Sequence, residues 1–154
     1  MFKIDDGNLV RIKDIGKRVK TGDVVGLEKK GYLRFNSKGK SYSVHNVIWM
    51  IHNQLDIPSG MVVDHIDGNP LNNRPENLRL ATIMQNSYNS KLYTSNTSGY
   101  KGVSFDRETG KWLAQIRIDG RNKKLGRYLT AELANEAVVK VRAVEHGRFA
   151  NDGL

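Results

Sequence analysis

Residues 61–88 decide the fold, and they read MVVDHIDGNPLNNRPENLRLATIMQNSY. The apolar run at 61–66 predicts a strand, and the polar stretch 67–77, rich in Asn, predicts a long loop after it. A short returning strand is expected next. Thr82 and Gln85 then fit the N-cap and N3 positions of a capping box, which predicts a helix. Elements in this order can bring the end of the first strand beside that helix.

Three side chains in this stretch suit metal-dependent hydrolysis of a phosphodiester. Asp64 and His65 end the first strand, and Asn86 lies in the first turn of the predicted helix. Carboxylate and amide oxygens suit a hard cation such as Mg²⁺, which takes few protein ligands. A histidine that titrates near neutrality can take a proton from water. The alternative stays open at this point, because Asp-His pairs are common and an Asn-rich loop also satisfies its own backbone.

The upstream residues predict short strands, turns and one helix. A turn at 5–8 separates two short apolar runs, and a hairpin is expected at 31–44 around a polar loop at 36–40. A helix is predicted at 45–53. One side of this segment carries Val44, Ile48 and Ile51. Another side carries His45, Trp49 and His52.

The downstream pattern predicts a three-stranded antiparallel sheet with one helix packed on it. Strands are expected at 102–106, 111–118 and 121–128, and the helix begins near Ala131. Alternation along the second strand assigns Trp112, Ala114 and Ile116 to the helix side. The same alternation assigns Lys111, Gln115 and Arg117 to the opposite side. The apolar face expected on the helix comprises Leu133, Ala134, Ala137, Val138, Val141 and Val144.

The charge of the chain points to an anionic partner. Its 154 residues include 25 Lys and Arg against 16 Asp and Glu, a formal net charge of +9. Segments 1–44, 45–91 and 92–154 carry net charges of +6, −1 and +4. A locally acidic centre therefore lies between two basic flanks that can hold phosphates. A basic surface that serves only solubility is the simpler alternative.

Composition also excludes several classes of protein. The chain has no cysteine, which excludes disulfides, cysteine zinc sites and a thiol nucleophile. The longest apolar run, 47–51, is far shorter than the roughly 18–20 residues of a membrane-spanning helix. The N-terminus lacks the apolar region of a signal peptide. We therefore expect a cytoplasmic protein without membrane contact.

The central segment resembles the HNH (ββα-metal) nucleases, in the branch that includes phage and intron-encoded homing endonucleases. The residues that carry the resemblance are His45–Trp49, Ile57–Met61, Val63–Arg79 and Gln85–Asn89. It implies that Asp64 and Asn86 bind the metal. It also implies two catalytic residues, His65 as the general base and Asn77 as the residue that pins the loop. His45 would contact a phosphate or support the site.

Asn86 stands at the last motif position, where other members of the family carry a His. This Asn matches the homing subfamily and departs from the HNH proteins that contain a structural zinc. The β-rich residues 1–44 resemble an extension that homing enzymes carry. The C-terminal residues 98–147 resemble the AP2/ERF DNA-binding domain. The residues behind this second resemblance are Ser98–Val103, Gly110–Arg117, Leu125–Tyr128 and Thr130–Ala134.

The AP2/ERF resemblance implies a sheet that lies in the major groove of DNA with a helix behind it. Together with the motif strand, it gives the expected DNA-binding residues Arg79, Lys101, Lys111, Gln115, Arg117, Arg121, Lys123 and Lys124. Ser104 and Asp106 stand where plant members often carry basic residues. The sequence preference of the plant domains is therefore not expected here.

We expect an α+β protein with an HNH nuclease domain and β-rich extension at 1–92, a linker at 93–99 and an AP2/ERF-like domain at 100–154. The predicted function is a homing-type or phage nicking endonuclease that cleaves double-stranded DNA by a one-metal mechanism. Mg²⁺ is the expected metal, with Mn²⁺ as a substitute and no other small-molecule cofactor. A monomer or a homodimer is expected. The alternative function is a non-catalytic DNA-binding regulator built on the same folds.

Overall fold

A computed structural model describes residues 1–15 and 17–153. The chain contains both helices and strands and is an α+β protein. It divides into two compact units, Met1–Thr82 and Ile83–Leu154. The division falls directly before the helix that carries Asn86, ten residues ahead of the last residue of the expected nuclease domain. No helix in the described part of the chain is long and apolar enough to cross a membrane.

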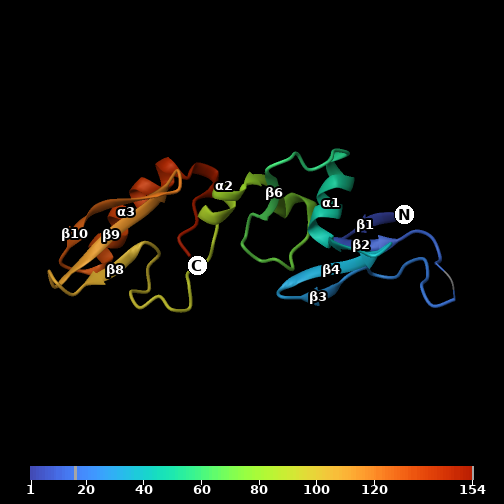
Figure 1. Ribbon diagram of the computed structural model, residues 1–154, viewed down its shortest axis with the longest axis horizontal. Helices are drawn as coiled ribbons and strands as arrows, with labels where there is room; N and C mark the ends of the chain where they lie inside the picture. Colours follow the sequence, from blue (N-terminus) through green and yellow to red (C-terminus); the bar gives the residue numbers. More distant parts are fainter. Residues whose placement is uncertain (16, 154) are drawn as a thin grey trace. The chain divides into compact units, whose positions relative to one another are not determined.

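The described residues of the first unit form three small antiparallel sheets and the helix α1, Val44–Asn53 (Figure 1). Its sheets are formed by β1 (Phe2–Asp5) and β2 (Asn8–Arg11), by β3 (Leu27–Lys29), β4 (Tyr32–Ser37) and β5 (Lys40–Ser43), and by β6 (Met61–His65) and β7 (Leu78–Thr82). The helix α1 (Val44–Asn53) follows β5, and a 3₁₀ turn, η1 (Pro75–Asn77), precedes β7.

Two expectations for the first unit need correction. The loop between β4 and β5 has two residues, Lys38 and Gly39, and not the five expected at 36–40. Both residues adopt positive φ, +48° and +74°, which fits the tight turn that matches strand twist. On α1, Trp49 is buried in the core with Val44, whereas Ile51 is exposed. The buried side of α1 is therefore rotated toward position 49.

The second unit contains α2 (Ile83–Tyr88), a three-stranded antiparallel sheet and α3 (Ala131–Glu145). The sheet has the order β10-β9-β8, formed by β8 (Val103–Asp106), β9 (Lys111–Ile118) and β10 (Arg121–Tyr128). A final 3₁₀ turn, η2 (Gly147–Phe149), follows α3. As Figure 1 shows, α3 runs along one face of this sheet.

The core between α3 and the sheet is made of small residues. Ala114 of β9 and Ala134 of α3 are fully buried. The expected apolar face of α3 is wrong at Leu133 and Val144, which are exposed, while Arg142 is buried. A guanidinium occupies this position because it finds hydrogen-bond partners there, as described below.

Candidate active site and nucleic-acid interface

Asp64 and His65 stand at the end of β6, and both side chains are buried, with 5% and 6% of their surface exposed. β6 pairs with β7 so that Asp64 lies opposite Arg79 and His65 lies opposite Leu78. A buried carboxylate requires a charged or hydrogen-bonding partner, since its desolvation is otherwise costly. The register of this two-stranded sheet supplies one.

Arg79 binds Asp64 directly. Its Nε and Nη2 atoms both lie 2.8 Å from Oδ2 of the carboxylate. The Arg79 side chain is itself 13% exposed, so this is a buried ion pair. The structure places the Arg79 guanidinium against the predicted metal ligand, and the expected contact of Arg79 with DNA stays a prediction.

His65 lies among three polar or aromatic residues that line the end of β6. Its Nε2 atom is 3.0 Å from Oδ1 of Asn73. The ring of His45 meets its ring edge to face at a centroid distance of 4.9 Å, and the ring of Tyr32 lies 6.2 Å away. Sequence reasoning had singled out His45 and missed both Asn73 and Tyr32.

His45 is neutral at physiological pH. Burial, followed by the charges of the neighbouring His65 and Arg34, lowers its pKa to about 4. A cationic contact between His45 and a phosphate is therefore disfavoured in this structure. Its geometry fits the other expected role, support of the site through ring contact with His65.

Asn77 closes the loop between β6 and β7. Its Oδ1 accepts from the backbone N–H of Asp67 at 3.1 Å, and its Nδ2 donates to Oδ1 of Asp67 and to the carbonyl of Asn72, at 2.9 and 2.8 Å. Although burial raises the pKa of Asp67, hydrogen bonds from Asn69, Asn72 and Asn77 hold it below its usual value. The loop is thus fixed by its own polar side chains.

Asn86 is exposed on α2 and belongs to the second unit. Its pairing with Asp64 at a metal therefore stays a prediction. Within the described residues, no three side chains of His, Cys, Asp and Glu cluster as a metal site. The donor set that the motif offers, one carboxylate and one amide oxygen, still fits Mg²⁺, because this ion retains several waters.

The sheet of the second unit sorts the expected DNA-binding residues onto two faces. Residues directly opposite each other in an antiparallel pair share a face. Lys124 lies opposite Gln115, and Asn122 lies opposite Arg117, so these four side chains share the face away from α3. Asn122 was missed by the sequence analysis, although the same alternation could have found it.

Arg121 and Lys123 stand on the other face, opposite Ile118 and Ile116. The Nζ atom of Lys123 lies 4.0 Å from Glu145 of α3, which agrees with this placement. The structure therefore does not bring Arg121 and Lys123 together with Gln115 and Arg117. Lys111 shares the outer face by alternation along β9.

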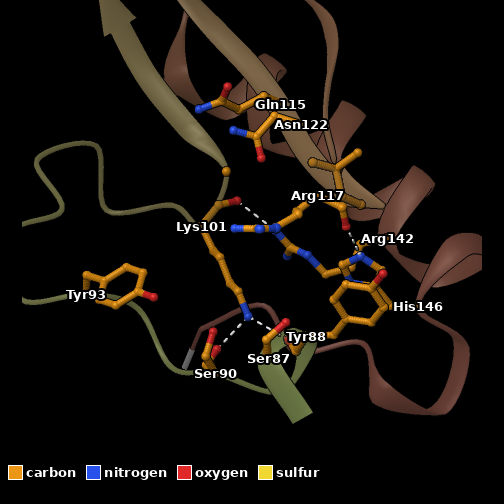
Figure 2. Close-up of a pocket in the computed structure, with 12 residues that line it drawn as sticks. Ser87, Tyr88, Ser90, Tyr93, Lys101, Gln115, Arg117, Asn122, Arg142 and His146 are labelled. Atoms are coloured by element: carbon orange, nitrogen blue, oxygen red, sulfur yellow. Dashed lines mark hydrogen bonds between the residues drawn. The ribbon is translucent and has the colours of Figure 1, made fainter. Parts of the chain in front are cut away.

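Lys101 occupies an interior position in the second unit, shown in Figure 2. Its Nζ donates to the carbonyls of Tyr88, Ser90 and Asn151. Burial, followed by the charge of Arg142, lowers the pKa of Lys101 to about 8. All three ammonium protons are engaged, so this lysine joins segments of the fold and has no donor left for a phosphate.

Arg142 and His146 complete this interior cluster beside a pocket of about 260 Å³. Arg142 donates to the carbonyl of Lys101 at 2.7 Å and pairs with Asp152. The ring of His146 stacks on Tyr88 at a centroid distance of 3.7 Å, and its Nε2 donates to the carbonyl of Arg117 (Figure 2). These contacts tie α2 and α3 to the end of β9.

The chain is similar to proteins of two kinds, nucleases and a phage protein. Residues 42–88 match the family model described as HNH endonuclease. The chain is 38% identical to Protein 3.8 of Escherichia phage T7 over 123 residues, and the aligned region covers 79% of this chain and 97% of that protein.

Two further relatives share shorter regions. An uncharacterized HNH endonuclease of Acanthamoeba polyphaga mimivirus is 45% identical over 78 residues, 51% of this chain and 41% of the relative. A candidate HNH homing endonuclease from the SPbeta prophage of Bacillus subtilis (strain 168) is 41% identical over 64 residues, 40% of this chain and 35% of the relative. No solved structure matches the chain. The segment that holds Asp64, His65 and Asn77 matches the HNH endonuclease family, and the protein as a whole belongs to the family of Protein 3.8 of phage T7.

Proposed function

We propose that this protein is a metal-dependent endonuclease that hydrolyses phosphodiester bonds in double-stranded DNA. The observation that carries the proposal is the consecutive pair Asp64 and His65, buried at the end of β6 within the segment that matches HNH endonucleases. Burying an acid and a base side by side is costly unless partners satisfy both. Such arrangements are concentrated at catalytic sites.

In this mechanism His65 takes a proton from the water that attacks phosphorus. Asp64 and Asn86 would hold the cation, Mg²⁺ or Mn²⁺, which stabilises negative charge on the phosphate and the leaving oxygen when bound. Asn77 keeps the intervening loop in the conformation that leaves His65 at the end of β6. His45 packs against the His65 ring and stays uncharged.

The second unit would bind the target DNA, in the manner of an AP2/ERF-like module. The proposed contact surface is the sheet face away from α3, which carries Lys111, Gln115, Arg117, Asn122 and Lys124. Amide and guanidinium side chains can pair with base edges in the major groove, while lysines hold phosphates. Lys101, Arg121 and Lys123 are left out of this surface because of their positions in the fold.

The proposed setting is a homing-type or phage DNA-processing enzyme in the cytoplasm of a bacterial host. With one His65 per chain, a monomer would nick one strand and a homodimer would cut both. The rival function is a DNA-binding regulator without catalysis. The presence of Asp64, His65 and Asn86 together favours the enzyme, because a regulator needs none of them.

A plasmid-nicking assay with Mg²⁺, and with EDTA in place of Mg²⁺, tests the proposal. The wild-type chain should convert supercoiled DNA to nicked or linear DNA only with the metal. His65→Ala should lower the rate by about 10²–10⁴-fold and leave DNA affinity intact. His52→Ala is the matched control, since His52 is an exposed histidine on α1. DNA binding without metal-dependent cleavage would favour the regulator.

A further inference from the structure

The sheet formed by β3, β4 and β5 has one face toward the core of the first unit and one open face. Leu33 and Phe35 of β4 pack against that core. Arg34 alternates with them and lies opposite Leu27 and Ser43, so these three side chains share the other face. Leu27 is 81% exposed, so this face is not covered within the described chain. By the same register, the open face carries Leu27, Lys29, Tyr32, Arg34, Asn36, Ser41 and Ser43.

The open face adjoins the end of β6 that holds His65. The centroid of the Tyr32 ring lies 5.6 Å from that of His45 and 6.2 Å from that of His65, and Tyr32 is itself 43% exposed. The charge of Arg34 also reaches this place. Burial is the main cause of the lowered pKa of His45, and the charges of His65 and Arg34 add to it. A phosphate beside His65 would therefore lie at the edge of the open face.

The two cations of the open face, Lys29 and Arg34, are available to a negatively charged ligand. Among the residues that the structure describes, no Asp or Glu forms an ion pair with either of them. Arg34 donates from Nε to the hydroxyl of Ser41 at 3.3 Å, which leaves its two terminal amino groups for a ligand. The open face carries no acidic side chain, so its charge complements a polyanion.

The other basic groups beside His65 are less suited to a phosphate. Arg79 is bound to the Asp64 carboxylate, and His45 is uncharged at physiological pH. Phosphate oxygens bind best to a planar guanidinium, which can donate two parallel hydrogen bonds. Arg34 is therefore the cation beside the site whose donors fit a phosphate.

We propose that the open face binds the phosphate backbone of the DNA substrate, with Arg34 holding a phosphate next to the bond that is cleaved. The inference rests on the proposed function and deepens it, because it names the surface of the first unit that contacts the same DNA. The polar side chains of this face belong to the types that contact phosphate and sugar in protein–DNA complexes, namely Lys, Tyr, Arg, Asn and Ser.

The first test measures binding of the full-length chain to duplex DNA in EDTA at several salt concentrations. Arg34→Met should weaken binding by about 10–100-fold, since a hydrogen bond to a charged group is lost. The log–log dependence of affinity on salt should also become shallower by about 0.9 for the one phosphate contact. Lys40→Met is the matched control, because Lys40 is exposed on the same sheet but lies opposite Ser37 on the face of Phe35. Its affinity and salt dependence should stay close to those of the wild type.

The second test separates charge from geometry and binding from folding. Arg34→Lys keeps the charge and loses the planar fork, so it should restore the salt dependence but only part of the affinity. In the nicking assay with Mg²⁺, Arg34→Met should raise KM by a factor similar to its loss of affinity, with a smaller change in kcat. Urea denaturation of Arg34→Met should resemble that of the wild type, because the side chain makes one described hydrogen bond.

The outcomes separate this proposal from the nuclease function. If the wild type nicks DNA and Arg34→Met keeps the wild-type affinity, salt dependence and KM, the open face does not bind the backbone, although the nuclease function stands. If Arg34→Met loses affinity and salt dependence while the wild type never cleaves, the surface stands and the nuclease function fails. An equal loss in Lys40→Met, or a loss of affinity with unchanged salt dependence, would overturn the phosphate contact.

Discussion

Replacing Arg79 by methionine should destabilise the first unit strongly. The change removes the guanidinium that lies 2.8 Å from Oδ2 of Asp64 and keeps most of the aliphatic chain. The carboxylate is 5% exposed, so water cannot take the place of the lost partner. Removing one partner of a buried pair costs about 3–5 kcal/mol, a large part of the roughly 5–15 kcal/mol that stabilises a typical domain.

Urea denaturation of the full chain, followed by fluorescence of the buried Trp49, measures this change. Arg74→Met is the matched control, because its ion pair with Asp6 is 55% and 76% exposed and should contribute no more than about 1 kcal/mol. A combined Asp64→Leu and Arg79→Met variant should recover most of the loss, since neither charge of the pair is then buried.

Metal adds a second observable to the same experiment. If Asp64 is a metal ligand, Mg²⁺ at a hundredfold excess over Kd should stabilise Arg79→Met by about 2.7 kcal/mol and the wild type by less, and EDTA should abolish the effect. A destabilisation below about 1 kcal/mol would refute the reasoning about the buried pair. Equal stabilisation of both proteins by Mg²⁺ would refute the coupling between Arg79 and the metal.

Three further predictions concern pH, DNA and metal use. Because the pKa of His45 is lowered to about 4, the unfolded chain binds a proton at this residue between pH 6.5 and about 4 while the native chain does not. The free energy of unfolding should therefore decrease as the pH is lowered through this window, and should decrease less in His45→Gln. Urea titrations at several pH values would measure both. Arg117→Ala should weaken DNA binding, by roughly 1–3 kcal/mol on a preferred site if Arg117 contacts a base edge, whereas Arg121→Ala on the opposite face should not. Binding isotherms that show the same loss of DNA affinity for both variants would contradict the assigned faces. Asp64→Ala should raise the metal concentration needed for cleavage more than Asn86→Ala does, because a carboxylate places a full negative charge next to the cation. If metal titrations of the nicking rate for both variants match the wild type, neither residue is a metal ligand.

Periodicity in the sequence predicted the strands and helices well and their faces less well. Alternation along β9 assigned Ala114 and Ile116 to the helix side, and both are buried. On α1 the apolar pattern offered two adjacent sides, and the larger Trp49 displaced Ile51 from the core. Which side of a helix is buried depends on the shape of the sheet that it packs against, and the periodicity of the sequence carries no information about that shape.

The polar contacts of the site were harder to predict, because they depend on register and loop conformation. The pairing of Asp64 with Arg79 requires the β6–β7 register, and the contact between Asn73 and His65 requires the closed loop. Lys101 carries no local signal of burial, since two of its three carbonyl partners lie 11 and 13 residues upstream and the third lies 50 residues downstream. His65 at the end of β6 could be recognised from the sequence, but the residues that contact its ring, Asn73 and Tyr32, could not.

The contacts of residues 151–153 also affect the order in which the two units can fold during synthesis. Asn151 accepts from Lys101 and donates to Asn89, and the carbonyl of Gly153 accepts from Leu92. At roughly 5–20 residues per second, a ribosome takes about 4–14 s to travel from residue 82 to residue 153. The first unit can fold in that interval, while the second unit still lacks its closing contacts. The helix that carries Asn86 therefore gains these contacts only after residues 151–153 have been synthesised.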